Sequence, residues 1–173
     1  SEKKDLLKLF ELSTKYYSNN LMSLNGKDAF RYIKSRGLRD QTIKKFKLGY
    51  AGQTGLKSYL NSEGFKDDIL FKAGLLRENG DGSQKEFFRN RLIFPIFDRK
   101  SNPIAFGGRA MFNSKAKYLN SPNSILFQKS ECLYGLSHLA REDFKSKPLL
   151  IVEGYMDVIS INQSKIAQGL APL

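Results

Sequence analysis

Two carboxylates follow a short apolar stretch near the C-terminal end of the sequence. Residues 149–152 read LLIV, Glu153 and Gly154 come next, and Asp157 lies four positions after Glu153. A strand that ends in a carboxylate and turns through a glycine into a helix places that carboxylate where open α/β sheets bind ligands. Mg²⁺ is often held by one or two carboxylates and substrate phosphates, so the pair could serve phosphoryl transfer. Alternatively, the carboxylates only interact with the dipole of the following helix.

A second group of candidate residues surrounds a pair of glycines. Gly107 and Gly108 lie in an apolar stretch and would suit a β-bulge or a close approach between a ligand and the backbone. Cations beside such a turn can bind phosphate groups, and an exposed tyrosine can stack on a nucleic-acid base. An ordinary β-meander with exposed lysines would show the same pattern. The candidates are Arg109, Lys115, Lys117, Tyr118 and Lys129.

Further cations gather in two other stretches. Lys34, Arg36 and Arg39 lie around one predicted turn, while Arg89 and Arg91 alternate and would share one side of a strand. Each group could be a solvated face, or the groups could together line a basic groove. No P-loop and no Ser/His/Asp set accompanies them.

The overall charge favours a polyanionic partner. Lys and Arg number 29 against 17 Asp and Glu, which gives a net charge of +12 at pH 7. This excess is typical of nucleic-acid-binding proteins, although a generic basic protein has it too. Cys132 and His138 are the only residues of their types, which excludes an intrachain disulfide and disfavours a zinc site. No apolar run is long enough to span a bilayer, and we expect a cytoplasmic protein without a membrane partner.

The first 64 residues have the periodicity of helices, with apolar residues recurring every three or four positions. Asp40 is positioned to cap the third of these helices. The order of a helix, an Arg-Gly-Leu turn and a short helix also fits a helix-turn-helix DNA reader, although the last helix is short for base recognition. Helices are predicted over 4–17, 26–38, 40–46 and 54–64.

The pattern then changes to that of strands. Apolar stretches at 91–98 and 102–112 flank turn residues and predict a β-hairpin, in which Pro95 requires a sheet edge or a bulge. A short extended segment is expected over 117–122. The fold class is therefore α+β. Towards the C-terminal end we predict a helix over 132–143, a buried strand over 148–153, a helix over 155–164 and a strand from 169.

The order of these stretches resembles that of bacterial DNA primase. VEGYMD, residues 152–157, is similar to the glutamate motif of the Toprim fold, which primases share with topoisomerases and some nucleases. FGGR together with KYLNSP is more specific and resembles the primase branch. The stretches that carry the resemblance are RNRLIFPIFD, IAFGGRAM, KYLNSP, FQKSECLYGL and LLIVEGYMD.

The resemblance implies a nucleotidyltransferase that makes short RNA primers from NTPs on a single-stranded DNA template, with Mg²⁺ or Mn²⁺. Residues 1–146 would form its basic N-terminal subdomain, helical and mixed α/β with a β-hairpin, and 147–173 the beginning of an α/β Toprim subdomain. Glu153 matches the catalytic, metal-binding glutamate, and Asp157 matches the aspartate of the same motif. The positions that match basic, cleft-lining residues of the family are Arg36, Arg109, Lys117, Tyr118 and Lys129.

The resemblance also implies parts that lie outside these residues. A complete Toprim fold has a second acidic cluster, zinc belongs to a separate domain, and the replicative helicase binds through another region. We therefore expect residues 1–173 to hold half of an active site and to be inactive alone. A non-catalytic single-stranded nucleic-acid-binding module and another Toprim enzyme, a topoisomerase or nuclease, stay as alternatives.

Overall fold

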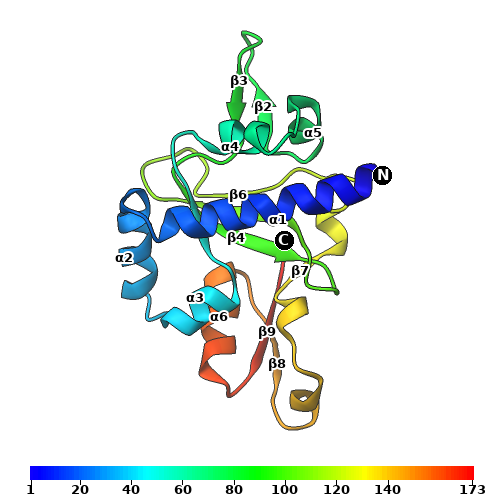
Figure 1. Cartoon of the computed structure of the whole chain (residues 1–173). Coiled ribbons are helices and arrows are strands. Elements are labelled where there is room, and N and C mark those ends of the chain that lie inside the picture. The colour runs from blue at the N-terminus through cyan, green and yellow to red at the C-terminus, as the bar shows by residue number, and fades with distance from the viewer.

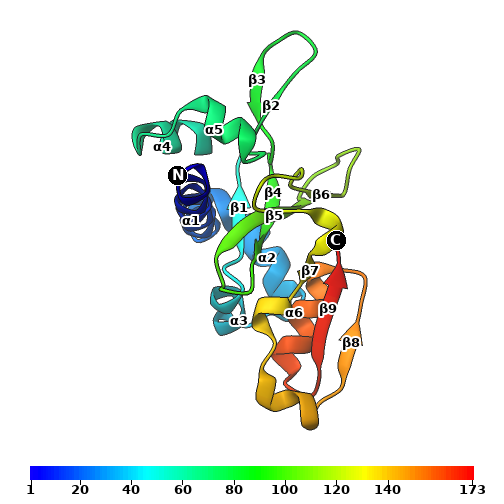
Figure 2. The same cartoon turned by 90° about the vertical axis from the view of Figure 1, so that its right-hand side faces the viewer.

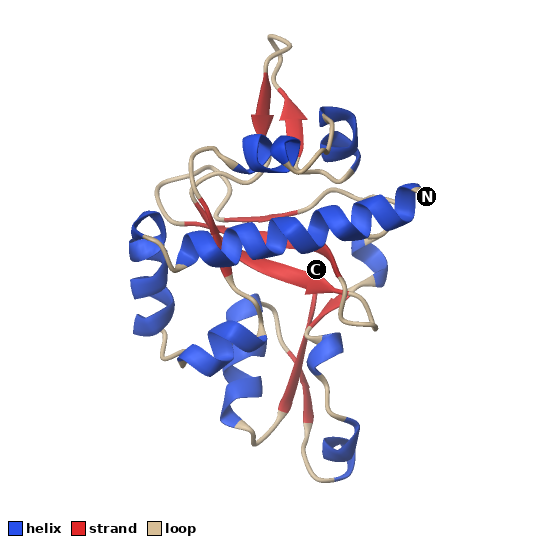
Figure 3. Ribbon diagram, in the orientation of Figure 1, coloured by secondary structure: helices blue, strands red, loops and turns tan.

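The computed structural model of the chain describes residues 1–173 and confirms the α+β class (Figures 1 and 3). The helices are α1 (Glu2–Leu21), α2 (Lys27–Ser35), α3 (Asp40–Lys45), α4 (Leu56–Ser62), α5 (Asp67–Lys72) and α6 (Tyr155–Ser164). Short 3-10 helices span Leu24–Gly26, Lys129–Glu131, Leu136–His138 and Arg141–Lys145. The strands are β1 (Gly49–Ala51), β2 (Leu76–Glu78), β3 (Gln84–Glu86), β4 (Arg91–Phe97), β5 (Pro103–Ala110), β6 (Tyr118–Asn120), β7 (Leu133–Tyr134), β8 (Leu149–Ile151) and β9 (Gln168–Pro172). They form a four-stranded sheet of order β1-β4-β5-β6, the hairpin β2–β3 and a three-stranded sheet of order β7-β9-β8.

The four helices predicted before residue 65 are present, but their ends are fixed differently from the prediction. Asp40 is the first residue of α3 and does not cap it; its carboxylate accepts a hydrogen bond from Lys34 Nζ at 2.9 Å. Helix α4 is capped by a residue that lies far from it in sequence. The buried Glu86 carboxylate accepts hydrogen bonds from the N–H groups of Gly55 and Lys57 at 2.8 and 3.0 Å. None of the helices combines the length and the apolar character that a membrane span requires.

The predicted hairpin forms the centre of the larger sheet. The Asp98 carboxylate accepts the backbone N–H groups of Lys100 and Asn102 at 2.8 and 2.9 Å, which closes the turn between β4 and β5. Pro95 lies in an interior strand, contrary to the predicted edge position, and the register of β4 and β5 shifts just after it, between Ile96 and Phe97. Strand β1 pairs only with residues 91–93, however, so no neighbouring strand on that side needs an N–H from Pro95.

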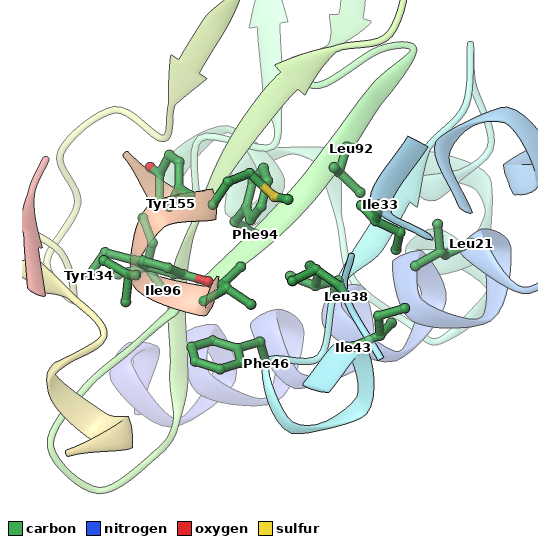
Figure 4. Packing of buried hydrophobic residues seen from close by; sticks show 14 of the residues in the cluster. Leu21, Ile33, Leu38, Ile43, Phe46, Leu92, Phe94, Ile96, Tyr134 and Tyr155 are labelled. Carbon is green, nitrogen blue, oxygen red and sulfur yellow. The ribbon is translucent and has the colours of Figure 1, made fainter. Parts of the chain in front are cut away.

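Helices cover both faces of this sheet, with α1 on one side and α2 on the other (Figure 2). On the first face, the rings of Phe10 and Tyr17 in α1 pack against Phe106 of β5. On the second, α2, α3 and α6 bury apolar side chains against β4, among them Ile33 and Tyr155 (Figure 4). This cluster includes residues from both sides of residue 146, and the division into two subdomains there stays a prediction.

The predicted helix over 132–143 is wrong. Strand β7 and two 3-10 helices occupy these residues instead. Gly135 has φ = +95°, in the left-handed region that favours glycine, and a Cβ there would lie 2.6 Å from Val158 Cγ1 in α6. The chain must therefore turn at Gly135 and run against α6, which a continuous helix would prevent.

The C-terminal segment forms the expected β-α-β unit, in which β8 and β9 pair in parallel and α6 connects them. The prediction that the strand over 148–153 is buried is wrong. Strand β9 is the only strand partner of β8, and Leu149, Leu150 and Ile151 are 43%, 42% and 66% exposed. The apolar run therefore marks a strand, but the side chains of that strand are left open to solvent.

His138, in the 3-10 helix that follows β7, packs against the C-terminal end of α3. Its ring stacks on Phe46 with the ring centroids 4.0 Å apart, and its Nε2 lies 3.2 Å from the carbonyl oxygen of Lys45. Burial of the ring lowers the pKa of His138 in the folded protein. It is the only histidine of the chain, so it should dominate the titration near neutral pH.

We predict that acidification destabilises the protein through His138. In the unfolded chain His138 has the ordinary histidine pKa of about 6.5, whereas its pKa in the folded protein is lower. The unfolded chain therefore binds more protons around this pH than the folded protein does. The free energy of unfolding should fall as the pH is lowered from about 7.5 to about 5.5. His138→Phe keeps an aromatic ring on Phe46 but does not titrate, and should lose less stability over this range. Urea unfolding at both pH values measures the two changes, and equal losses would contradict the assignment.

Candidate functional site

Glu153 and Asp157 line the same pocket. The pocket has a volume of about 400 Å³ and lies between the N-terminal end of α6, strand β6 and the end of β9. Neither carboxylate takes part in a salt bridge within the chain. Both are exposed and face a space that could admit a ligand. The residues that line it are Tyr118, Asn120, Glu153, Gly154, Tyr155, Asp157, Ala171, Pro172 and Leu173.

The floor of this pocket depends on Tyr155. Its ring lies against the backbone of Gly107, where any Cβ would overlap the ring. The ring stacks on Phe94 at 4.8 Å between centroids and meets Tyr134 edge-on at 4.6 Å (Figure 4). Its hydroxyl donates a hydrogen bond to Oδ1 of Asn120. Burial raises the pKa of Tyr155, so the hydroxyl stays protonated and remains a donor at neutral pH.

The glycine pair serves side-chain packing and forms no bulge. Gly107 and Gly108 pair regularly with Phe94 and Ile93 across the hairpin. Gly107 leaves room for the Tyr155 ring on one face, and a Cβ on Gly108 would lie 2.8 Å from a ring carbon of Phe88. The expectation of a bulge is therefore wrong, and the groups that approach this backbone closely belong to the chain itself.

Arg109 and Tyr118 lie side by side next to the pocket, because they are direct partners across β5 and β6. The guanidinium of Arg109 stacks on the ring of Tyr32 in α2, with Cζ 4.1 Å from the ring centroid. Its Nη1 donates to the carbonyl of Ala110 at 3.1 Å, while its Nε is buried without a hydrogen-bond partner. Tyr118 is 45% exposed and stacks on Tyr155 at 6.5 Å. The exposed Tyr118 ring thus lines the pocket together with the two carboxylates, and Arg109 lies beside that ring.

The other predicted binding residues are exposed but do not line this pocket. Arg36 follows the last residue of α2, and Lys117 directly precedes β6. Lys129 begins a 3-10 helix, where its backbone N–H donates to Oδ1 of Asn123 at 2.9 Å. None of the three forms a salt bridge within the chain. Their side chains are therefore exposed charges that no acidic side chain of the chain neutralises.

Arg91 lines a hollow together with Arg89, as predicted for the pair, and its guanidinium also has a structural role. It is 7% exposed, and its guanidinium donates to the carbonyls of Gly108, Ala116 and Lys117 and to Ser114 Oγ. Burial lowers the pKa of Arg91. The five-donor fork of an arginine suits this task, and it holds in place the loop that leads to β6.

Arg89 lines a second hollow, of about 520 Å³, on the side of the sheet that carries the β2–β3 hairpin. Arg77 and Lys115 line it as well, no acidic residue does, and Phe112 beside them is 61% exposed. Sequence patterns did not indicate Arg77 or Phe112. Tyr155 and Asn120 were also missed as site residues, although both lie within the motifs VEGYMD and KYLNSP.

Comparison with known proteins places this chain among the catalytic cores of DNA primases. Residues 16–140 match the family described as DNA primase catalytic core, N-terminal domain. The chain belongs to this family, which confirms the resemblance seen in its sequence motifs.

Individual relatives are similar to this chain in sequence or structure over nearly its whole length. The DNA primase of Deinococcus radiodurans is 39% identical over 173 residues, covering 98% of this chain and 30% of that protein. The structure of the DnaG primase catalytic domain bound to single-stranded DNA has a TM-score of 0.86 at 35% identity and covers 99% of this chain and 56% of the other. The zinc-binding and RNA polymerase domains of the Aquifex aeolicus primase give a TM-score of 0.87 at 29% identity, covering 100% of this chain and 43% of the other. The chain thus spans about 30% of the length of the curated relatives it matches.

We predict that Gly107→Ala destabilises the protein, because the new methyl group must displace the Tyr155 ring. Overpacking of this kind costs about 1–3 kcal/mol of unfolding free energy. Gly80→Ala is the matched control: no atom lies within 4 Å of its added Cβ, and the change should stay within about 0.5 kcal/mol. Thermal and urea unfolding compare the two variants, and wild-type stability of Gly107→Ala would refute the packing argument.

Proposed function

We propose that residues 1–173 belong to a bacterial DNA primase and carry part of the site at which RNA primers are made from NTPs on a single-stranded DNA template. Membership of the primase family supports this proposal. The observation that carries it is the pocket, which brings Glu153 and Asp157 together with Tyr118. Carboxylates beside an exposed ring and a neighbouring cation are what a site for metal-bound nucleotides requires.

Glu153 and Asp157 would hold Mg²⁺ or Mn²⁺. The donor set fits a hard cation, because it offers carboxylate oxygens and leaves positions free for water and phosphate oxygens. When bound, such a cation neutralises the charge that develops during phosphoryl transfer. The set does not fit zinc, since residues 1–173 contain no group of three or more His, Cys, Asp or Glu that could hold a metal. Zinc would belong to a separate domain.

The basic residues would bind the polyanions. Arg109 has donors left over beyond its contact with Ala110 and would contact a phosphate group, while Tyr118 would stack on a base. Arg36, Lys117 and Lys129 would contribute exposed charge around the template and the RNA primer. The hollow lined by Arg77, Arg89 and Lys115 would extend this surface. Contact with the replicative helicase would be made through another region of a complete primase in the cytoplasm.

Single-stranded DNA binding should be strongly salt-dependent. The logarithm of affinity should fall linearly with the logarithm of salt concentration, with a slope of about −0.7 per contacted phosphate. Arg109→Ala and Lys117→Ala should weaken binding, each reducing the steepness by about 0.7. Lys72→Ala removes the same charge where Glu2 already neutralises it at 2.9 Å, and should bind like the wild type. Anisotropy titrations of a labelled oligonucleotide measure the affinity at each salt concentration. An affinity that does not change with salt would contradict the proposed basic binding surface.

Glu153→Gln tests the chemistry in a complete primase that carries residues 1–173. If Glu153 organises the metal or handles a proton, primer synthesis at saturating NTPs and Mg²⁺ should fall by about 10²–10⁴-fold. Affinity for single-stranded DNA and the melting temperature should hardly change, because the basic residues supply the affinity. Asp157→Asn should have a smaller effect if it only orients the ligand set.

A purely structural role of Glu153 predicts a different result for the same variant. If the Glu153 carboxylate only interacts with the dipole of α6, the substitution should cost about 0.3–1 kcal/mol of stability and leave primer synthesis intact. An active, slightly destabilised enzyme would therefore favour a non-catalytic nucleic-acid-binding role for this segment.

A further inference from the structure

The backbone that carries Glu153 is anchored to the sheet on one side only. Strand β8 has no strand partner except β9, and the last ladder contact before Glu153 is the hydrogen bond from Val152 N to Leu170 O, at 2.8 Å. Glu153 itself is exposed and forms no salt bridge within the chain. Pairing with β9 does not fix its distance from β6, across the pocket. Some other contact must do so.

Tyr155, two residues further on, makes that contact. Its side chain is almost fully buried, and its hydroxyl donates to Oδ1 of Asn120 in β6. Asn120 is the direct partner of Gly107 in β5, so the acceptor belongs to the central sheet. The N-terminal end of α6 is thereby tied to the strand that carries Tyr118 on the opposite wall of the pocket.

The ring and the hydroxyl of Tyr155 have separable effects. The flat stack on Phe94, with planes 10° apart, holds α6 against the sheet but tolerates sliding in the plane of the rings. A hydrogen bond is directional and short, so the bond to Asn120 defines where along the sheet the helix begins. Because Asp157 lies half a turn beyond Tyr155, the same bond sets its position as well.

We propose that the hydrogen bond between Tyr155 and Asn120 is a positioning contact, which sets the distance of Glu153 and Asp157 from the β6 wall and so tunes the affinity of the carboxylate pair for a divalent cation. This inference rests on the proposed function of Glu153 and deepens it. Tyr155 touches neither metal nor substrate in this scheme and acts only through the geometry of its neighbours.

The test compares Tyr155→Phe, Asn120→Leu and the double variant in a complete primase that carries residues 1–173. Binding of Mn²⁺ is measured by the loss of the free-ion EPR signal, and the Mg²⁺ concentration for half-maximal primer synthesis is measured in parallel. Residues that orient metal ligands typically change affinity by 10–100-fold, so each single variant should weaken Mn²⁺ binding about tenfold and raise the Mg²⁺ midpoint to match. The double variant should be no worse than the singles, since both remove the same bond.

Tyr134→Phe is the matched control. Tyr134 lies in the same aromatic cluster and is as deeply buried, but its hydroxyl has no hydrogen-bond partner. Loss of that hydroxyl should leave Mn²⁺ affinity and the Mg²⁺ midpoint unchanged. A merely structural role for Tyr155 would lower the melting temperature or the active fraction without moving either metal readout, and that result would overturn the inference.

Failure of the inference differs from failure of the proposed function. If Glu153→Gln is inactive but Tyr155→Phe and Asn120→Leu bind Mn²⁺ like the wild type, the positioning contact is wrong and the role of Glu153 stands. If Glu153→Gln is fully active, the proposed function itself fails, whatever the effect of Tyr155→Phe. Additive losses in the double variant would mean that the two residues act separately, which also contradicts the inference.

Discussion

The site depends on the contact between the ring of Tyr155 and the bare backbone of Gly107. This contact brings the first turn of α6 against the middle of the central sheet, at a distance that only a residue without a side chain permits. Glu153 and Asp157 flank Tyr155 in sequence and are therefore carried to the wall formed by β6. A larger residue at position 107 would move the ring, the helix and both carboxylates together.

The arginines of the sheet show how one residue type serves different purposes within one hairpin. Arg91 donates to carbonyl groups of β5 and of the loop before β6, because a buried guanidinium needs hydrogen-bond partners. The guanidinium of Arg109 stacks on the ring of Tyr32 and makes one hydrogen bond within the chain, to the carbonyl of Ala110. The net charge of +12 therefore overstates the positive charge that is exposed on the surface.

Local patterns in the sequence were sufficient for the helices before residue 65, for the central hairpin and for the placing of Glu153 after a strand. Features that depend on distant contacts were not predictable in this way. The turn at Gly135 is imposed by Val158, and the glycine pair is required by Tyr155 and Phe88. Likewise, an apolar run such as LLIV is the same whether or not other elements cover its strand. The motifs identified the family, but the packing reasons for Gly107, Asn120 and Tyr155 appear only in three dimensions.

The exposed apolar edge of β8 and the positive net charge have opposite effects on association between copies of the chain. Leu149, Leu150, Ile151 and the neighbouring Ile166, which is 75% exposed, offer an adhesive strip at an unpaired strand edge. The surplus positive charge keeps copies of the chain apart in dilute buffer, where the screening length is about 30 Å, but far less at 0.15 M salt, where it is about 8 Å. Added salt therefore encourages copies of the chain to adhere through β8, and light scattering at the two salt concentrations would measure this association.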